Sequence, residues 1–283
     1  MKQADAFVKL AFVPYCHHLA MNALKRLSIL LSLLLLITAC ATNLAGRRQL
    51  MLVSENQAIQ ASKQAYVNTL KPFQQKGKLN NDPKLVARIQ RITDRLIEQA
   101  KILRPETRKW DWSVKIIDDP DTVNAWCMAG GKMAIYTGLI DKLKATDDEI
   151  AQVMGHEIAH ALLNHSAERM SVAMATQLAV GAYAQSKNAS PGKTALAAVA
   201  AQVAITLPNS RTSESEADRV GIELAARAGY DPRAAVTLWQ KMAKLGGGRP
   251  PEFLSTHPSP KNREKALRKL VVKMMPYYLK NKS

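Results

Sequence analysis

Two histidines separated by three residues, with a glutamate directly after the first, are the side chains best arranged for chemistry in the stretch VMGHEIAHALLNH, residues 153–165. On an α-helix, positions i and i+4 differ by about 40° around the axis, so the rings of His156 and His160 can meet on one ion. Zinc binds imidazole nitrogen at about 2.0–2.1 Å, and a catalytic zinc needs a third protein ligand and an open position for water. Glu157 is placed to take a proton from that water.

The motif alone does not exclude a helix that carries histidines by chance, so a third ligand has to decide. Downstream, NSRTSESEADRVG places Glu214, Glu216 and Asp218 in the first turns of another helix. Glu214 and Asp218 are four residues apart and share a face. Acidic residues at a helix start also complement the helix dipole, so alone this cluster would be a solvated helix end. Coupled to the histidines, a glutamate from this second helix completes a two-histidine, one-glutamate zinc site.

The elements that position these residues are expected to form an α+β fold, mainly helical, with a small mixed β-sheet beside the motif helix. Asp82 and Pro83 predict a helix start. WDWSVKII alternates apolar and polar residues, as a half-buried strand does, and TVNAWCMAGGKMAIYTG predicts a β-hairpin around Gly130–Gly131. Thr146 and Glu149 form a capping box at the start of the motif helix.

Further helices are expected on both sides of this centre. One is expected across roughly residues 51–70, and the alanine-rich residues 170–207, broken at SKNASPGK, predict a helical hairpin that is a lid or packs in the core. The remaining helices are expected from about Ser213 to Ala228, from Asp231–Pro232 to the glycines at 246–248, and from Ser259–Pro260 onward. Gly155 would let another backbone approach the motif helix closely.

Four ordered blocks of sequence resemble a known family, the zinc metalloendopeptidases that include the CAAX prenyl protease, the heat-shock protease HtpX and the periplasmic proteases BepA and LoiP. The blocks are NAWCMAGGKMAIYTGLI, HEIAHALLNHSAERM, SESEADRVG and THPSPKNR. The resemblance covers roughly residues 80–275 and implies a zinc metallopeptidase domain like that of the periplasmic lipoprotein branch. The chain shows no long apolar segments like those of the membrane-spanning relatives, which argues against processing of prenylated proteins inside a bilayer.

The resemblance implies roles for the motif residues. His156, His160 and Glu214 would bind one Zn²⁺ ion, and Glu157 would be the catalytic acid and base. Asp218 matches an acidic residue of the family that orients a ligand histidine or donates a proton, and the sequence leaves both roles open.

Other residues of these blocks would contact the substrate. The block before the motif resembles the family's edge strand, on which an extended peptide lies by strand addition. The candidates for that strand are Met133, Ala134, Ile135 and Tyr136. His257 matches a histidine of the periplasmic members that approaches the metal and affects activity, although a histidine before proline is also an ordinary turn residue. The oxyanion donor would be His257, Tyr136 or Arg263.

Two side chains near the motif are expected to be structural. His165 lies five residues past His160, about 140° further round the helix, so packing is favoured over binding to the same ion. Cys127 is expected to be a small buried hydrophobe. Because it is the one cysteine expected in the folded part, no intramolecular disulfide is expected.

The N-terminal region has the features of a secretory signal: a basic pair, a short apolar run and small residues before Cys40. The run is too short to span a bilayer, which takes roughly 20 residues. Ile37 to Cys40 resembles a bacterial lipobox, so Cys40 is expected to be lipidated, with translation beginning at Met1 or Met21. The reactive side chains of the leader, expected to have no function, are Cys16, His17 and His18.

The charge balance is compatible with this address. The formal net charge is +17, which suits nucleic acid or anionic lipid as a partner. By resemblance to Gram-negative lipoproteins, Ala41 after the cysteine implies the periplasmic face of the outer membrane, where nucleic acid is not expected. A basic surface would add electrostatic attraction to the lipid anchor, and a merely solvated lysine-rich surface explains the charge equally well.

With 283 residues and 47% hydrophobic composition, the chain can bury one substantial core. The expected segments are a leader and signal peptide (1–39), a tether and N-terminal helix (40–80), a zinc metallopeptidase domain (81–275) and a C-terminal tail (276–283). The leading hypothesis is a lipid-anchored periplasmic zinc metalloendopeptidase acting on misfolded or stalled envelope proteins. The alternative is a latent protease that acts mainly as a chaperone-like factor with the outer-membrane assembly machinery. A structural lipoprotein with an accidental motif is disfavoured by the third ligand.

Overall fold

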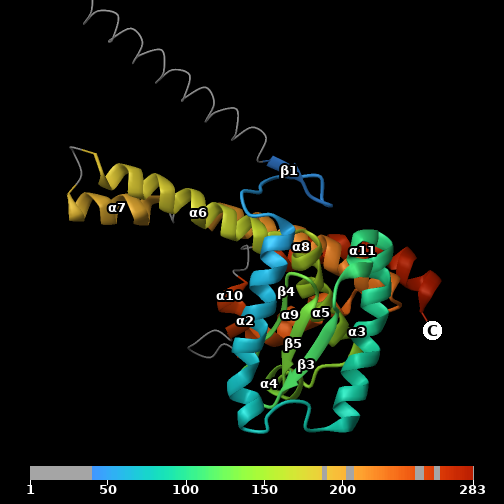
Figure 1. The fold of residues 1–283 in the computed structure, drawn as a ribbon. Coiled ribbons are helices and arrows are strands. Elements are labelled where there is room, and N and C mark those ends of the chain that lie inside the picture. The colour runs from blue at the N-terminus through green and yellow to red at the C-terminus, as the bar shows by residue number, and fades with distance from the viewer. Residues whose placement is uncertain (1–39, 187–189, 202–206, 246–251, 258–261, 283) are drawn as a thin grey trace, which may run out of the picture.

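A small mixed β-sheet lies between helices in the middle of the molecule (Figure 1). The computed structural model describes residues 40–186, 190–201, 207–245, 252–257 and 262–282. The predicted leader, the glycines expected to end one helix and the predicted start of the last helix at Ser259–Pro260 lie outside these residues. The mainly helical α+β fold predicted from the sequence is confirmed.

The elements follow one another along the chain in a fixed order. They are β1 (Cys40–Thr42), β2 (Arg48–Leu50), α2 (Glu55–Gln75), α3 (Pro83–Leu103), a 3₁₀ turn (Pro105–Lys109), β3 (Ser113–Ile117), β4 (Ala125–Met128), β5 (Lys132–Tyr136), α4 (Thr137–Lys142), α5 (Asp147–Leu162), α6 (His165–Ala184), α7 (Pro191–Ala201), α8 (Leu207–Arg227), α9 (Ala234–Leu245), α10 (Glu252–Thr256) and α11 (Arg263–Asn281).

The central sheet has the strand order β3-β5-β4. β4 and β5 form the predicted hairpin, and its turn uses Gly130 and Gly131 at φ +83° and +80°, which favour glycine. β3 pairs in parallel with the other side of β5. The expectation that Met133 to Tyr136 form an edge strand is therefore wrong. These residues form the middle strand, because the chain segment before the hairpin returns to cover their outer side, and β4 is left as an edge.

The two faces of β5 pack against different helices. Met133 and Ile135 belong to the main core with α3 and α5. The alternate residues Ala134 and Tyr136 face α2, and the Tyr136 ring meets Phe73 edge-on at 6.2 Å between centroids. Of the three candidates for the oxyanion donor, Tyr136 does not fit, because strand alternation points its side chain to the face away from the motif helix.

The motif helix α5 is buried along almost its whole length between the sheet and the helices α3, α8 and α9. Its predicted capping box is present: the Thr146 hydroxyl accepts from the backbone N–H of Glu149, and the Glu149 carboxylate accepts from that of Thr146. Lys241 of α9 lies 2.6 Å from the same carboxylate. The start of α5 is therefore fixed by a buried charge network as well as by packing.

α5 and α8 cross with backbone against backbone. A Cβ atom added to Gly221 would lie 2.7 Å from the backbone N and Cα of His156, and one added to Gly155 would lie 2.9 Å from the carbonyl oxygen of Gly221. Both distances are shorter than ordinary contacts between carbon and backbone atoms. The expected close approach at Gly155 is present, and Gly221 is the matching residue on the other helix.

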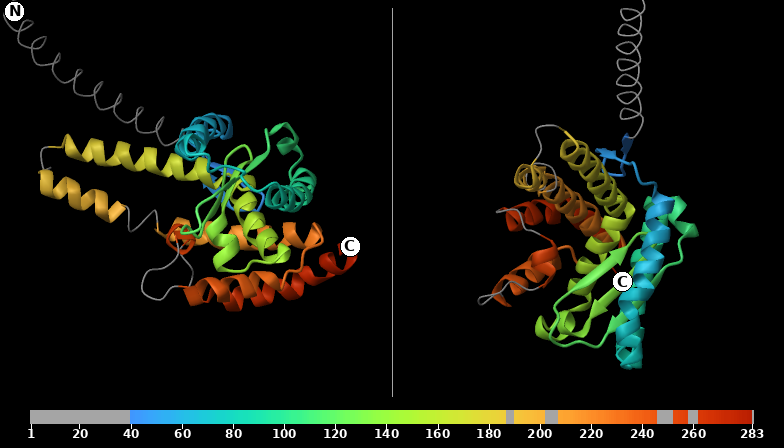
Figure 2. Two further views of the ribbon diagram at one scale, coloured as in Figure 1. Left: turned by 90° about the horizontal axis from the view of Figure 1, so that it is seen from below. Right: turned by 60° about the vertical axis from the view of Figure 1, so that its left-hand side comes forward.

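The predicted helical hairpin is formed by α6 and α7, which projects from the body of the molecule (Figure 2). Its exposed side chains include Met174, Leu178, Leu196 and Val199. The hairpin therefore does not pack in the core, one of its two expected roles. Among the described residues, no helix combines the length and apolar character needed to cross a membrane.

Both ends of the described chain are more structured than expected. The predicted tether begins with the antiparallel pair β1–β2, in which Cys40 lies opposite Leu50. The predicted tail from residue 276 continues as α11 to Asn281, and Tyr277 and Tyr278 pack on the helical core. A proline within this helix did not end it, because tertiary packing outweighs its local preference.

The buried carboxylate of Glu149 predicts acid-sensitive stability. Burial raises its pKa, but hydrogen bonds from Lys241, Thr146 and Thr237 outweigh burial and hold the pKa below its ordinary value of 4.5. Its stabilising effect is therefore fully present above pH 4.5 and is lost as the pH falls through the lower folded-state pKa. We expect Glu149→Gln to reduce the free energy of unfolding by about 1–2 kcal/mol at pH 7.

Denaturant unfolding at several pH values measures this effect. The difference between Glu149→Gln and the parent chain should shrink below pH 4.5. Glu98→Gln is the matched control, because Glu98 pairs with Lys101 at an exposed position of α3. A difference that stays constant with pH would contradict the assignment.

Candidate metal centre

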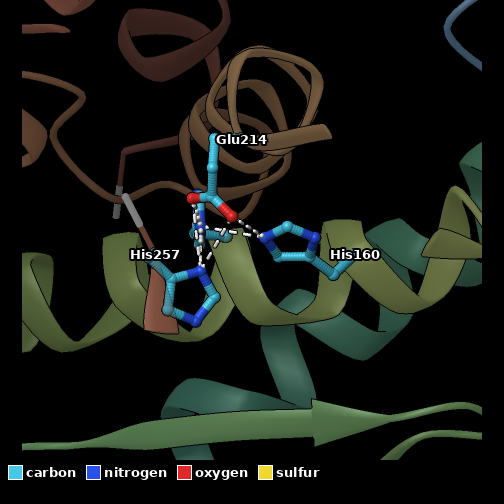
Figure 3. A group of neighbouring side chains, drawn as sticks. His160, Glu214 and His257 are labelled. Carbon is cyan, nitrogen blue, oxygen red and sulfur yellow. Dashed lines mark hydrogen bonds and ion pairs between the residues drawn. The ribbon is translucent and has the colours of Figure 1, made fainter. Parts of the chain in front are cut away.

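Four buried side chains from three segments converge beside α5. His156 and His160 come from α5, Glu214 from α8, and His257 from the turn after α10. One ligand atom of each lies within 4.8 Å of those of the others. Figure 3 shows Glu214 reaching down from α8 onto His160 and His257. Glu214 is 58 residues from His156 and 54 residues from His160 in sequence. The direct contact between α5 and α8 brings these three predicted ligands together.

The spacing of the first three donors fits a tetrahedral zinc ion. The Nε2 atoms of His156 and His160 are 3.1 Å apart, and Glu214 oxygens lie 3.3 Å and 3.4 Å from them. A tetrahedron with zinc bonds of about 2.0–2.1 Å has edges of roughly 3.3–3.4 Å between ligand atoms. The donor set and the distances therefore fit one zinc ion bound by two imidazoles and one carboxylate.

Asp218 contacts one of these histidines. Its carboxylate lies 3.1 Å from His156 Nδ1 and 2.6 Å from Arg263 Nη2. Because Nδ1–H donates to Asp218, the neutral, metal-binding form of His156 has its lone pair on Nε2, which faces the other donors. Of its two predicted roles, this position fits orientation of the ligand. Arg263, one of the three candidates for the oxyanion donor, binds Asp218 and lies over Trp239, 3.5 Å from the ring centroid.

Glu157 and His257 face each other at the open side of the donor set. Glu157 Oε1 lies 3.3 Å from His257 Nε2 without forming a hydrogen bond, and it has no hydrogen-bond partner within the described part of the chain. His257 Nδ1 lies 3.1 Å from Glu214 Oε1. Of the two positions that the sequence left open for His257, it occupies the one beside the metal donors.

A cavity of about 440 Å³ lies in front of these groups. Its lining includes Glu157, His160 and His257 on one side and β4 on the other. Tyr136 N–H donates to the Asn124 carbonyl, so in an antiparallel pair the backbone groups of Trp126 and Met128 also face β5. The backbone N–H and carbonyl of Cys127 then point away from β5, to the open edge of the sheet. Cys127 itself is buried in the core through its side chain, as predicted.

His165 contacts the centre in a way that its sequence position did not suggest. Its Nδ1 lies 2.8 Å from His160 Nδ1, and its Nε2 lies 3.0 Å from Glu216 Oε2. The estimate of its direction assumed a continuous helix, but α5 ends at Leu162 and Asn164 has φ +56°. The break turns His165 back toward His160. A left-handed residue such as asparagine between two helical runs was the available signal.

Burial and hydrogen bonding set the pKa values of the side chains in this centre. Burial lowers the pKa of His160 and of His165 below the ordinary value. For His156, burial lowers the pKa, but hydrogen bonds with Asp218 and Glu214 outweigh it and raise the pKa to about 9. Burial raises the pKa of Glu157, which suits a carboxylate that accepts a proton near neutral pH. A cation is the complement that this group of buried carboxylates requires.

The donor geometry predicts metal-dependent stability. Zinc added to the chelator-stripped chain at a free concentration one hundred times its Kd should add about 2.7 kcal/mol to the free energy of unfolding and raise Tm by roughly 5–10 °C. Glu214→Ala should abolish this shift. Glu223→Ala should keep it, because Glu223 lies further along α8 and pairs with Arg227. A thermal shift that survives Glu214→Ala would contradict the ligand set.

Comparison with known proteins gives the family. Metalloprotease YcaL of Escherichia coli is 30% identical over 245 residues, covering 83% of this chain and 95% of that protein. Mitochondrial metalloendopeptidase OMA1 of Arabidopsis thaliana is 40% identical over 159 residues, 55% of this chain and 31% of that protein. The Beta-barrel assembly-enhancing protease of Escherichia coli is 31% identical over 196 residues, 65% of this chain and 38% of that protein. The chain thus spans about a third of the length of the last two.

The family comparison agrees with the geometry of the centre. Residues 83–271 match the model of peptidase family M48, a range that contains every donor described above. The prediction of a metallopeptidase is confirmed at the level of the family, while the choice of a periplasmic lipoprotein branch stays a prediction. The chain belongs to peptidase family M48.

Proposed function

We propose that this chain is a zinc-dependent endopeptidase that hydrolyses peptide bonds in extended segments of unfolded proteins. The observation that carries the proposal is the position of Glu157. Its buried carboxylate faces a cavity between the metal donors and the open edge of β4. A base, a metal site and a strand edge are the groups that peptide hydrolysis by a zinc enzyme requires.

The residues divide the reaction between them. Zinc bound by His156, His160 and Glu214 would supply a Lewis acid that polarises the attacking water and the scissile carbonyl. Glu157 accepts a proton from that water and passes it to the departing amine, which its raised pKa favours. His257 Nε2 lies beside Glu157 and, when both nitrogens of the imidazole carry a proton, can donate to the developing oxyanion.

The substrate would lie along β4 and not along β5. The backbone of Cys127 offers an N–H and a carbonyl on the open side of the strand, which an extended peptide can pair with. The side chains of Trp126 and Met128 line the same cavity and would contact the substrate. An edge strand needs an unfolded segment as its partner, so folded proteins would be poor substrates.

Sequence features and one relative support a cellular location and a class of substrates for this activity. The lipobox-like residues before Cys40 support a lipid anchor at the periplasmic face of the outer membrane of a Gram-negative bacterium. Cys40 is exposed and therefore accessible for modification. One relative is named Beta-barrel assembly-enhancing protease, which supports misfolded or stalled envelope proteins as substrates and the outer-membrane assembly machinery as a partner.

The second candidate function is a latent protease that acts mainly as a chaperone-like binding factor. The position of His257 favours it, because the imidazole lies 3.1 Å from Glu214 and 3.3 Å from Glu157. From there it can take the position that water or a substrate carbonyl needs. The site would then bind zinc without turnover until His257 moves.

Replacement of Glu157 tests the two functions together. The full chain in mild detergent and its Glu157→Gln variant are loaded with zinc, and cleavage of an unfolded fluorescent polypeptide is measured. Losing the base should reduce kcat by about 10²–10⁴-fold while zinc stays bound at one ion per chain. Equal cleavage by both zinc-loaded forms would contradict the role of Glu157.

The same assay decides between an active and a latent enzyme. If neither form cleaves although both hold zinc, the latent function is favoured, and His257→Ala should then release cleavage that still requires Glu157. If the parent cleaves, the endopeptidase function stands. If the parent binds no zinc, both functions are wrong.

A further inference from the structure

The N-terminal pair β1–β2 contacts the helices that carry or adjoin the metal donors. Arg47, in the turn between the two strands, binds Glu168 at the start of α6 and Glu216 on α8, at 2.6 Å and 2.7 Å. Asn43 donates to Glu216 at 3.0 Å. Gln49 donates to Glu168 and to the carbonyl of Leu163. This segment therefore ties together the end of α5, the start of α6 and the ligand-bearing helix α8.

The arginine holds its two carboxylates with more contacts than a simple ion pair has. Both terminal nitrogens donate to Glu168, at 2.6 Å and 2.7 Å, while Nε and Nη2 donate to Glu216, at 2.7 Å and 3.2 Å. Such fork-like pairing fixes the carboxylate plane as well as its charge. Glu168 is buried and Glu216 nearly so. Both carboxylates are thus held in one orientation.

From Glu216 a chain of hydrogen bonds reaches a metal ligand. Glu216 can only accept from His165 Nε2, so the proton of a neutral His165 is on Nε2 and its lone pair is on Nδ1. That lone pair accepts from His160 Nδ1–H at 2.8 Å. The lone pair of His160 is then on Nε2, the atom that faces His156 and Glu214. Each bond in the series dictates the next.

We propose that β1–β2 is a positioning device for the metal centre, in which Arg47, through Glu216 and His165, fixes the ring orientation and tautomer of His160. The inference rests on the proposed function in one respect, that His160 binds the metal. The other histidine ligand is held differently: Asp218 accepts directly from His156. Arg47, Glu216 and His165 are positioning residues, since none of them lines the cavity in front of Glu157.

The arrangement links the proposed lipid anchor to the chemistry. Cys40 pairs with Leu50 and Thr42 pairs with Arg48 within β1–β2, and Arg47 lies in the turn just before Arg48. The residue expected to carry the lipid and the arginine that supports His160 are therefore parts of one short hairpin. Detaching this hairpin from α8 would release Glu216 and so loosen the ligand, even though no residue of the cavity changes.

Metal affinity of Arg47→Ala in the full chain tests the proposal. Zn²⁺ affinity is measured by competition with a chromophoric chelator, and the Co²⁺ absorption spectrum reports ligand geometry. Replacing an outer partner of a ligand typically weakens metal binding about 10–100-fold. We expect Glu216→Ala to fall in that range, Arg47→Ala to weaken binding about 3–10-fold because it acts one step further away, and Arg47→Lys to restore part of the loss.

Arg88→Ala is the matched control. Arg88 is partly exposed like Arg47 and binds Asp147 and the Ala145 carbonyl at the other end of α5. It should lower the Tm of the metal-free chain as Arg47→Ala does, yet leave zinc affinity and the cobalt spectrum unchanged. Equal zinc affinity in the parent, Arg47→Ala and Glu216→Ala would overturn the proposal and make the hairpin a purely structural element.

A double-mutant cycle separates positioning from general loosening. In a His165→Ala background the path from Arg47 to His160 is cut, so Arg47→Ala should cause no further loss of affinity. Losses that multiply independently would overturn the proposal. If His165→Ala does not fold, the comparison of Arg47→Ala with Arg88→Ala decides alone. If the parent binds no metal, the proposed function fails, an outcome distinct from a metal-binding parent that is indifferent to Arg47.

Discussion

The close crossing of α5 and α8 is the constraint on which the metal centre depends. Helices that pack through side chains typically have axes about 8–10 Å apart. Here the two backbones are in contact, because Gly155 and Gly221 have no Cβ atom. A Cβ atom added at either position would lie within 2.9 Å of the backbone of the other helix. Glu214, Asp218 and Gly221 occupy positions i, i+4 and i+7 of α8 and share one face. The contact at the glycine therefore sets how deeply the two carboxylates reach toward His156 and His160.

This approach concentrates buried charge, and the surroundings compensate for it. Glu157, Glu214 and Asp218 are all buried within one centre, and an unpaired buried charge costs several kcal/mol. Arg263 offsets part of this cost, because it pairs with Asp218 at 2.6 Å and is stacked on Trp239. On the far side, Arg47 offsets Glu216 and Glu168. The central carboxylate, Glu214, lies among three histidines, with Arg263 Nη1 at 3.4 Å, and the histidines hold its pKa well below the ordinary value despite burial.

Sequence patterns predicted those parts of the structure that depend on neighbouring residues. The capping box at Thr146, the glycine hairpin and the histidine pair on one helix face are all local, and each is present. The strand order was not predictable in this way, because β3 pairs in parallel with β5 although β4 lies between them in sequence. That pairing moves the open edge from β5 to β4. Tyr136 was misassigned for the same reason: its role depends on which face of the sheet meets α5.

The remaining differences also arise from contacts between distant residues. Arg47 meets its two carboxylates across 121 and 169 residues of sequence, so its region looks like a polar tether when read alone. The predicted direction of the His165 side chain was wrong, because α5 ends before this residue and Asn164 has a left-handed backbone conformation. The ligand glutamate was inferable only because its block accompanies the histidine motif. A metal centre built from separate helices is thus visible in sequence as parts, while its supports are visible only in the fold.

Zinc affinity of Gly221→Ala tests most directly whether the crossing makes the metal centre. One methyl group at this position would have to push α8 away from His156, whereas Gly181 on α6 has open space around it and provides the matched control. The account predicts that Gly221→Ala keeps its helical circular dichroism but loses at least tenfold in zinc affinity, and that Gly181→Ala binds zinc like the parent. Parental zinc affinity in Gly221→Ala would contradict the account.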